Sequence, residues 1–212
     1  MNKTKAAKTE QSVVDGSGTF TDERDGQTYK TVKMPDGKVW MAQNLNYKPE
    51  SGNSWCYNDD ESMGEKYGRL YDWETAETVA PAGWHLPSRQ EWRKLRSVVG
   101  GKKVAGMKLK SKSGWGWNDD DNASGIGSGI GSGIGSGIGT DDYGFSALPG
   151  GVRDEFGNFA LAGYAGIWWT TDMVCTCGVA YHWYMYYNND GVLEKTHDMS
   201  AGFSVRCVKD SN

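Results

Sequence analysis

The most informative part of this sequence is Tyr67-Gly-Arg-Leu-Tyr-Asp-Trp73 together with Gly83-Trp-His-Leu-Pro-Ser-Arg-Gln-Glu-Trp92. The second segment contains a capping box, in which the Ser88 hydroxyl accepts from the Glu91 amide and the Glu91 carboxylate accepts from the Ser88 amide. Pro87 disfavours helical backbone just before this cap. The pattern predicts a helix over residues 89–99 that ends at Gly100-Gly101. Its buried residues are expected to be Trp92, Leu95 and Val99.

Apolar residues at helical spacing also predict an earlier helix over residues 67–79, ended by Pro81 and Gly83. The apolar positions are Leu70, Trp73, Ala76 and Val79. His85 lies in the connector between the two predicted helices. We expect it to make a structural hydrogen bond between helix and sheet.

Alternation of apolar and polar residues predicts strands in much of the remaining chain. Residues 28–34 and 38–41 form a hairpin around Pro35-Asp-Gly37, where proline presets φ and glycine accepts a left-handed conformation. Asn188-Asn-Asp-Gly191 is a second predicted hairpin turn. The other predicted strands cover residues 167–171, 179–187, 192–196 and 203–208.

Composition restricts the class of partner. The chain has 23 Lys and Arg against 27 Asp and Glu, a net charge of -4. The basic residues are scattered, which argues against binding to a nucleic-acid backbone. No segment is apolar enough to span a membrane. We interpret residues 19–212 as one domain, preceded by a disordered polar leader over residues 1–18 in which no signal peptide is visible.

A low-complexity tract interrupts the predicted domain. Ser124 to Gly139 is four copies of Ser-Gly-Ile-Gly, which lacks the side-chain volume needed for a core. We expect a flexible insertion. The alternative is a docking loop that becomes ordered on a partner, with the isoleucines as contacts.

Five separated blocks resemble the Fibrobacter succinogenes major paralogous domain, a family of bacterial surface or secreted proteins. In order along the chain they are Gly37-Lys-Val-Trp-Met-Ala-Gln-Asn-Leu-Asn46, Tyr67-Gly-Arg-Leu-Tyr71, Pro81-Ala-Gly-Trp-His-Leu-Pro87, Asp141-Asp-Tyr-Gly-Phe-Ser-Ala-Leu-Pro-Gly-Gly151 and Gly202-Phe-Ser-Val-Arg-Cys-Val-Lys-Asp210.

The resemblance implies an α+β fold similar to C-type lectins and to formylglycine-generating enzymes. Two helices would pack on irregular antiparallel sheets, with the termini close together, in an extracellular or cell-surface protein. Relatives often carry cysteine at the positions of Met63 and Ala80, so part of their disulfide set is missing here. The resemblance leaves Cys56 and Cys207 as the expected disulfide.

Aromatic side chains are the main candidates for ligand binding, because ring faces stack on the C–H surfaces of sugars. The candidate residues are Trp115, Trp117, Trp169, Tyr184 and Tyr186. Trp115 and Trp117 lie in a glycine-rich loop and are expected to be the most exposed. The alternative for each ring is a place in the core.

Acidic residues on both sides of the Ser-Gly-Ile-Gly tract suggest calcium, a cation that takes six to eight oxygen ligands. The candidate ligands are Asp119, Asp120, Asp121, Asp141 and Asp142. The alternative is an acidic flank that only keeps the tract solvated. No other cofactor is indicated.

No catalytic constellation is evident, so we predict a non-catalytic extracytoplasmic recognition domain that binds a polysaccharide or a cell-surface protein. A structural or protein-interaction module is the first alternative. An oxidase of the formylglycine-generating type is the second, because Cys175 and Cys177 invite comparison with the redox-active cysteine pair of those enzymes. Their C-x-C spacing differs from the pattern of that group.

Overall fold

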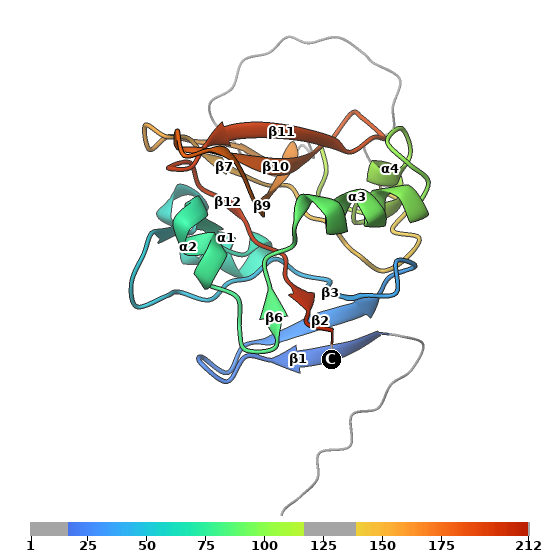
Figure 1. The fold of residues 1–212 in the computed structure, drawn as a ribbon, viewed down its shortest axis with the longest axis horizontal. Coiled ribbons are helices and arrows are strands. Elements are labelled where there is room, and N and C mark those ends of the chain that lie inside the picture. Colours follow the sequence, from blue (N-terminus) through green and yellow to red (C-terminus); the bar gives the residue numbers. More distant parts are fainter. Residues whose placement is uncertain (1–16, 117–138, 212) are drawn as a thin grey trace, which may run out of the picture.

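The computed structural model of the protein describes residues 17–116 and 139–211, which form a mixed α+β fold. Two antiparallel-dominated sheets lie one above the other in Figure 1, with α1 and α2 on one side and α3 and α4 on the other. The predicted leader lies outside the described residues up to residue 16, and β1 begins at Ser17. The Ser-Gly-Ile-Gly tract is also outside them, apart from Gly139.

The first sheet has five strands in the order β1-β2-β3-β13-β6 and is antiparallel throughout. Its strands are β1 (Ser17–Thr21), β2 (Thr28–Lys33), β3 (Val39–Met41), β13 (Val208–Lys209) and β6 (Trp84–His85). The first and last strands of the described chain therefore share one sheet, as the resemblance implied. The predicted hairpin is confirmed: Thr31 pairs with Met41, and Gly37 has a φ of 89°.

The second sheet has six strands in the order β11-β10-β9-β12-β5-β4. It is antiparallel except where β12 meets β9. Its strands are β11 (Leu193–Asp198), β10 (Val179–Tyr186), β9 (Ala165–Cys175), β12 (Phe203–Ser204), β5 (Leu70–Tyr71) and β4 (Ser54–Trp55). A separate hairpin is formed by β7 (Gly150–Arg153) and β8 (Phe159–Ala162). The predicted turn at residues 188–191 joins β10 to β11, which confirms that hairpin.

The helices are α1 (Glu61–Tyr67), α2 (Trp73–Thr78), α3 (Arg89–Val98) and α4 (Ala105–Leu109), and a short 3-10 turn covers Tyr57–Asp59. Helix α3 confirms the capping box: Ser88 Oγ accepts from Glu91 N at 3.2 Å, and Glu91 Oε2 accepts from Ser88 N at 2.8 Å. All three predicted core residues of α3 are buried. The Trp92 ring stacks on Trp183 of β10 with centroids 5.6 Å apart.

The single helix predicted over residues 67–79 is wrong. Helix α1 ends at Tyr67, Gly68 follows with a φ of 79°, and residues 70–71 form strand β5. A new helix begins only at Trp73, because the Asp72 carboxylate caps it by accepting from Thr75 N at 2.9 Å. The apolar positions were nevertheless identified correctly as core, since all four are buried.

The strand predicted over residues 203–208 is also divided. Residues 203–204 belong to the second sheet and Val208–Lys209 to the first, so the intervening residues cross between sheets. His85 confirms its predicted role there. Its Nδ1 lies 2.6 Å from Asp210 Oδ1, and its Nε2 lies 2.9 Å from Glu91 Oε1 of α3.

A buried carboxamide joins these elements. Asn44 Oδ1 accepts from Trp168 Nε1 at 2.9 Å and from Arg206 Nη2 at 3.0 Å. Its Nδ2 donates to the Tyr67 carbonyl at 2.8 Å and to Ser204 Oγ at 3.3 Å. Both the acceptor and the donor of this amide are therefore used within the core.

We expect Asn44→Ala to lower the free energy of unfolding by about 3 kcal/mol. The variant leaves the buried Trp168 indole N–H without its acceptor and removes one of the acceptors of the buried Arg206 guanidinium. Urea denaturation measures the change. Asn158→Ala is the control. The Asn158 amide lies at an exposed turn, where it donates to the Asp154 carboxylate, and its loss should lower the free energy of unfolding by less than about 1 kcal/mol. Equal losses in the two variants would contradict this role for Asn44.

Candidate functional site

Two of the tryptophans predicted to bind ligand belong to the core, so those predictions are wrong. Trp115 is 6% exposed and Trp169 is 0% exposed. Trp115 Nε1 donates to the Ala147 carbonyl at 2.9 Å, and Trp169 Nε1 donates to the Tyr71 carbonyl at 2.8 Å. Each ring satisfies its only polar group inside the protein and offers no face to a ligand. Trp117 lies outside the described residues.

Tyr184 and Tyr186 are placed differently, because both are only half-buried on one face of β10. Their rings are stacked, with centroids 5.8 Å apart and planes 14° from parallel. Residues two apart on a strand share a face, which brings the rings side by side. They line a groove of about 190 Å³ with Asn188, Asn189, Gly191 and Leu193 from the β10–β11 turn and β11.

Lys110, which is 1% exposed, holds the backbone that carries the groove. Its ammonium donates to the carbonyls of Tyr186 at 2.6 Å, Asn189 at 2.8 Å and Tyr187 at 3.3 Å. Burial lowers the pKa of Lys110 to about 8. The charge is still present at neutral pH, and it fixes the turn that carries the groove's amide side chains.

The phenol of Tyr184 stays neutral across the physiological range. Burial, followed by the nearby Tyr186, raises the pKa of Tyr184 to about 12. Lys195 Nζ lies 4.6 Å from the Tyr184 ring centroid, in cation–π contact with it. The groove thus combines ring surfaces, a neutral hydroxyl and the amides of Asn188 and Asn189.

The predicted calcium ligands are not gathered by the described chain. The Asp141 carboxylate accepts from Ser146 N at 2.7 Å and from Ser146 Oγ at 2.6 Å. Asp142 lies 3.9 Å from Lys108 Nζ. Among residues 17–116 and 139–211 there is no group of three or more His, Cys, Asp or Glu arranged to hold a metal. Asp119, Asp120 and Asp121 lie outside those residues.

The predicted Cys56–Cys207 disulfide is wrong, because both cysteines are buried free thiols. Cys56 Sγ lies 3.1 Å from Arg69 Nη1 and 3.2 Å from Glu61 Oε2, whereas Cys207 lies in the core. The two thiols therefore have separate surroundings, which cysteine spacing does not reveal. Burial raises the pKa of Cys56 to about 11 and that of Cys207 to about 12.

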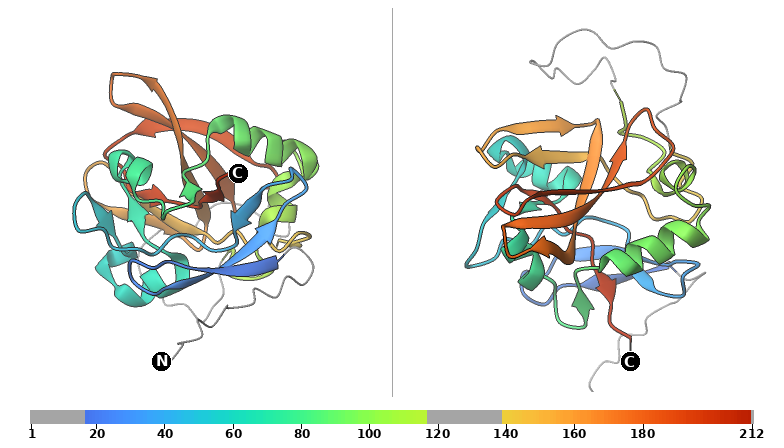
Figure 2. Two further views of the ribbon diagram at one scale, coloured as in Figure 1. Left: turned by 60° about the horizontal axis from the view of Figure 1, so that its bottom comes forward. Right: turned by 45° about the horizontal axis from the view of Figure 1, so that its top comes forward.

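The disulfide instead joins Cys175 and Cys177. It lies at the exposed end of the β9–β10 hairpin, which projects from the rest of the fold (Figure 2, left).

Sequence reasoning missed a second hollow. It is lined by amide side chains, among them Gln27, Gln43 and Asn46. The available signal was the Gln43-Asn-Leu-Asn46 run, in which buried Asn44 and Leu45 are flanked by half-buried amides.

Residues 32–209 match the family described as Fibrobacter succinogenes major domain. The chain belongs to this family. The match extends from β2 to β13 and confirms the resemblance seen in the five sequence blocks. No curated protein and no solved structure matches the chain. Within the described part of this family member, no helix is long and apolar enough to cross a bilayer.

We expect Lys110→Met to lower the free energy of unfolding by roughly 3 kcal/mol, because three carbonyls lose a charged donor while the side-chain volume is kept. Hydrogen exchange should rise around residues 186–191. Lys108→Met, which removes a half-exposed lysine near Asp142, is the matched control and should cost less than about 1 kcal/mol. Unchanged exchange in Lys110→Met would contradict the supporting role.

His182, on the same face of β10 as Tyr184, should make stability depend on pH. Burial, followed by His197, lowers the pKa of His182 from 6.5 to about 3. As pH falls from 6.5 to 3, His182 is protonated in the unfolded state but stays neutral in the folded state. The free energy of unfolding therefore decreases across this window. The loss attributable to His182 is on the order of 4 kcal/mol at pH 3.

His182→Phe should therefore lose less stability than the wild type between pH 6.5 and 3, as measured by urea denaturation at several pH values. His197→Gln is the comparison variant and should keep most of the wild-type loss. Parallel curves for the wild type and His182→Phe would show that His182 does not cause the acid sensitivity.

Proposed function

We propose that this chain is a non-catalytic recognition domain that binds carbohydrate through the Tyr184–Tyr186 groove. The observation that carries the proposal is the pair of stacked, half-exposed rings beside the amides of Asn188 and Asn189. Among the four predicted ligand-binding aromatics that lie in the described residues, these two share a hollow surface.

The chemistry of the groove suits a sugar. The flat ring of a pyranose has C–H surfaces that pack on an aromatic face, and its hydroxyls need both donors and acceptors. The tyrosine rings supply an aromatic face for the C–H surfaces, and the side-chain amides supply donors and acceptors for the hydroxyls. Because Lys110 and the β10–β11 turn hold the groove in place, a ligand would meet a largely preformed surface.

We further propose a C-type-lectin-like fold and an extracytoplasmic location. Support for the fold comes from the shared sheet of β1 and β13 and from the capped helix α3 that follows the Trp84-His-Leu-Pro87 connector. Support for the location comes from the Cys175–Cys177 disulfide, since disulfides persist mainly in oxidising compartments. Finding the native protein only in the cytoplasmic fraction of cells would contradict the second proposal.

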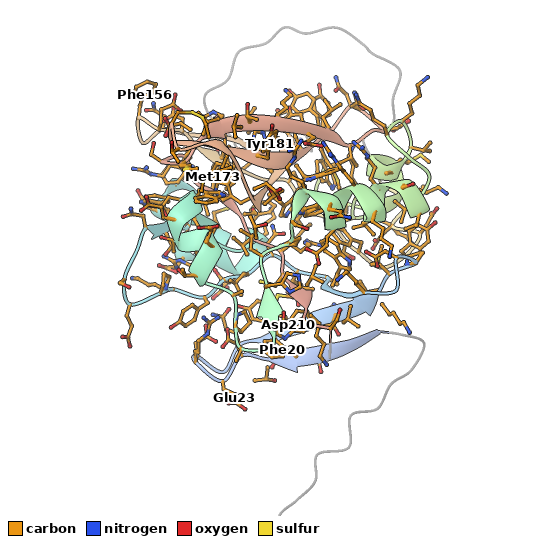
Figure 3. All side chains as sticks on the ribbon, in the orientation of Figure 1. Phe20, Glu23, Phe156, Met173, Tyr181 and Asp210 are labelled. Atoms are coloured by element: carbon orange, nitrogen blue, oxygen red, sulfur yellow. A yellow bond between two sulfur atoms is a disulfide. The ribbon has the colours of Figure 1, made fainter. Side chains whose placement is uncertain are left out.

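A protein-interaction module is the second candidate. It is favoured by exposed apolar side chains in two places. Phe156 in the β7–β8 turn is 83% exposed, and Met173 and Val174 near the end of β9 are 46% and 47% exposed. Phe156 is labelled at the edge of the molecule in Figure 3. Failure to retain any polysaccharide would leave this candidate as the better one.

Carbohydrate binding is tested with a glycan array and with cellulose and xylan affinity gels. Tyr184→Ala and Tyr186→Ala should each weaken retention about five- to tenfold, since a lost aromatic contact costs roughly 1 kcal/mol. Phe156→Ala removes an exposed ring elsewhere and should leave retention unchanged. Absence of retention by folded wild-type protein, or equal effects of all three variants, would rule out the groove as the site.

A further inference from the structure

The amide-lined hollow is a second place where a small molecule fits. It has a volume of about 220 Å³ and lies between the start of β2, the segment that follows β3 and the C-terminal end of α1. These elements are separate from the β10–β11 hairpin that forms the tyrosine groove. A hollow of this size admits one small ring and no more, since pockets for larger ligands start at about 300 Å³.

Close backbone approach fixes the walls of this hollow. A Cβ at Gly64 would lie 2.5 Å from Cys56 Sγ and 3.1 Å from Asn46 Oδ1. At Gly68, where φ is +79°, it would lie 2.8 Å from the Leu45 carbonyl. Only glycine at these two positions allows the end of α1 to lie so close to residues 44–46, so the backbone forms this wall of the hollow.

The lining amides have hydrogen-bonding capacity that the described residues do not use. Gln43 Oε1 accepts from Lys30 N at 2.7 Å, which leaves its Nε2 donor without a partner in residues 17–116 and 139–211. Gln27 Nε2 donates to Asp25 Oδ2 at 2.6 Å and to the Asn46 carbonyl at 3.2 Å, so its Oε1 acceptor is left over. Asn46 Oδ1 is buried and also accepts no hydrogen bond.

An unused donor beside unused acceptors restricts the ligand. A buried polar atom without a partner costs about 1–3 kcal/mol, so an apolar occupant would leave that cost in place. Glu65 and Lys66 also line the hollow, and their opposite charges favour neither an anion nor a cation. A hydroxyl group both donates and accepts, so it can match both the Gln43 donor and the Gln27 acceptor.

We propose that this hollow binds one neutral sugar unit, with Gln43 Nε2 donating to a sugar oxygen and Gln27 Oε1 accepting from a sugar hydroxyl, beside the Asn46 side chain. The inference rests on the proposed carbohydrate class and adds a second site on a different sheet. A chain with two such sites would hold a polysaccharide at two separated points, which raises avidity without new contacts.

The test follows the side-chain amide signals of the full chain by NMR while glucose, galactose, xylose or N-acetylglucosamine is added. Titration should reach concentrations that saturate a site with a Kd of about 10 mM. At least one sugar should shift the signals of Gln27, Gln43 and Asn46 together. Gln43→Glu keeps the acceptor for Lys30 N but removes the donor, so it should weaken this binding about tenfold while leaving the melting temperature unchanged.

Asn188→Asp is the matched control, because it makes the same chemical change in the tyrosine groove and should leave binding at the hollow unaltered. No shift of the three amides with any sugar would overturn this inference, as would wild-type affinity in folded Gln43→Glu. Retention of polysaccharide that depends on Tyr184 and Tyr186 would still support the proposed function. Shifts at the hollow without such retention would support the second site and reject the groove.

Discussion

The buried guanidinium of Arg206 constrains the arrangement of both sheets. It is 0% exposed, and burial lowers the pKa of Arg206 to about 9. A charge removed from water is tolerated only when its donors are satisfied. Here the acceptors are the Asn44 amide oxygen and the carbonyls of Phe145 and Ser146, while the Phe145 ring lies 4.5 Å away. Since these residues come from separate parts of the chain, the segment after β3, the segment before β7 and the crossing from β12 to β13 must all be in place together.

The two candidate binding surfaces depend on buried polar side chains of this kind. Asn44 uses its whole amide inside the protein, and Asn46, two residues later, contributes to the hollow. Lys110 does the same for the tyrosine groove, because its buried ammonium donates to backbone carbonyls of the β10–β11 turn. In both places a satisfied interior polar group positions a neighbouring residue at the surface. Such support is what allows loop residues to hold a defined geometry.

The tryptophans serve mainly to build the interior. Trp40, Trp92, Trp168, Trp169 and Trp183 are all fully buried, and several make edge or stacking contacts with one another. Large rings fill the space between short strands and irregular segments, where aliphatic runs are scarce. High aromatic content was therefore a correct indication of the core but a poor guide to ligand contacts, because ring identity alone does not reveal exposure.

The sequence by itself determined the features that depend on neighbours along the chain: the capping box of α3, the turn at Gly37, the turn at residues 188–191 and the family. Each rests on bonds or backbone preferences within a few residues. Tertiary structure decided the rest. Leu70 and Tyr71 form a strand rather than a helix because Trp55, Ser54, Phe203 and Ser204 supply the pairing. The fate of the cysteines, the burial of Trp115 and the amide-lined hollow likewise depend on groups that meet only in the folded chain, and no local pattern encodes which distant residue will be the neighbour.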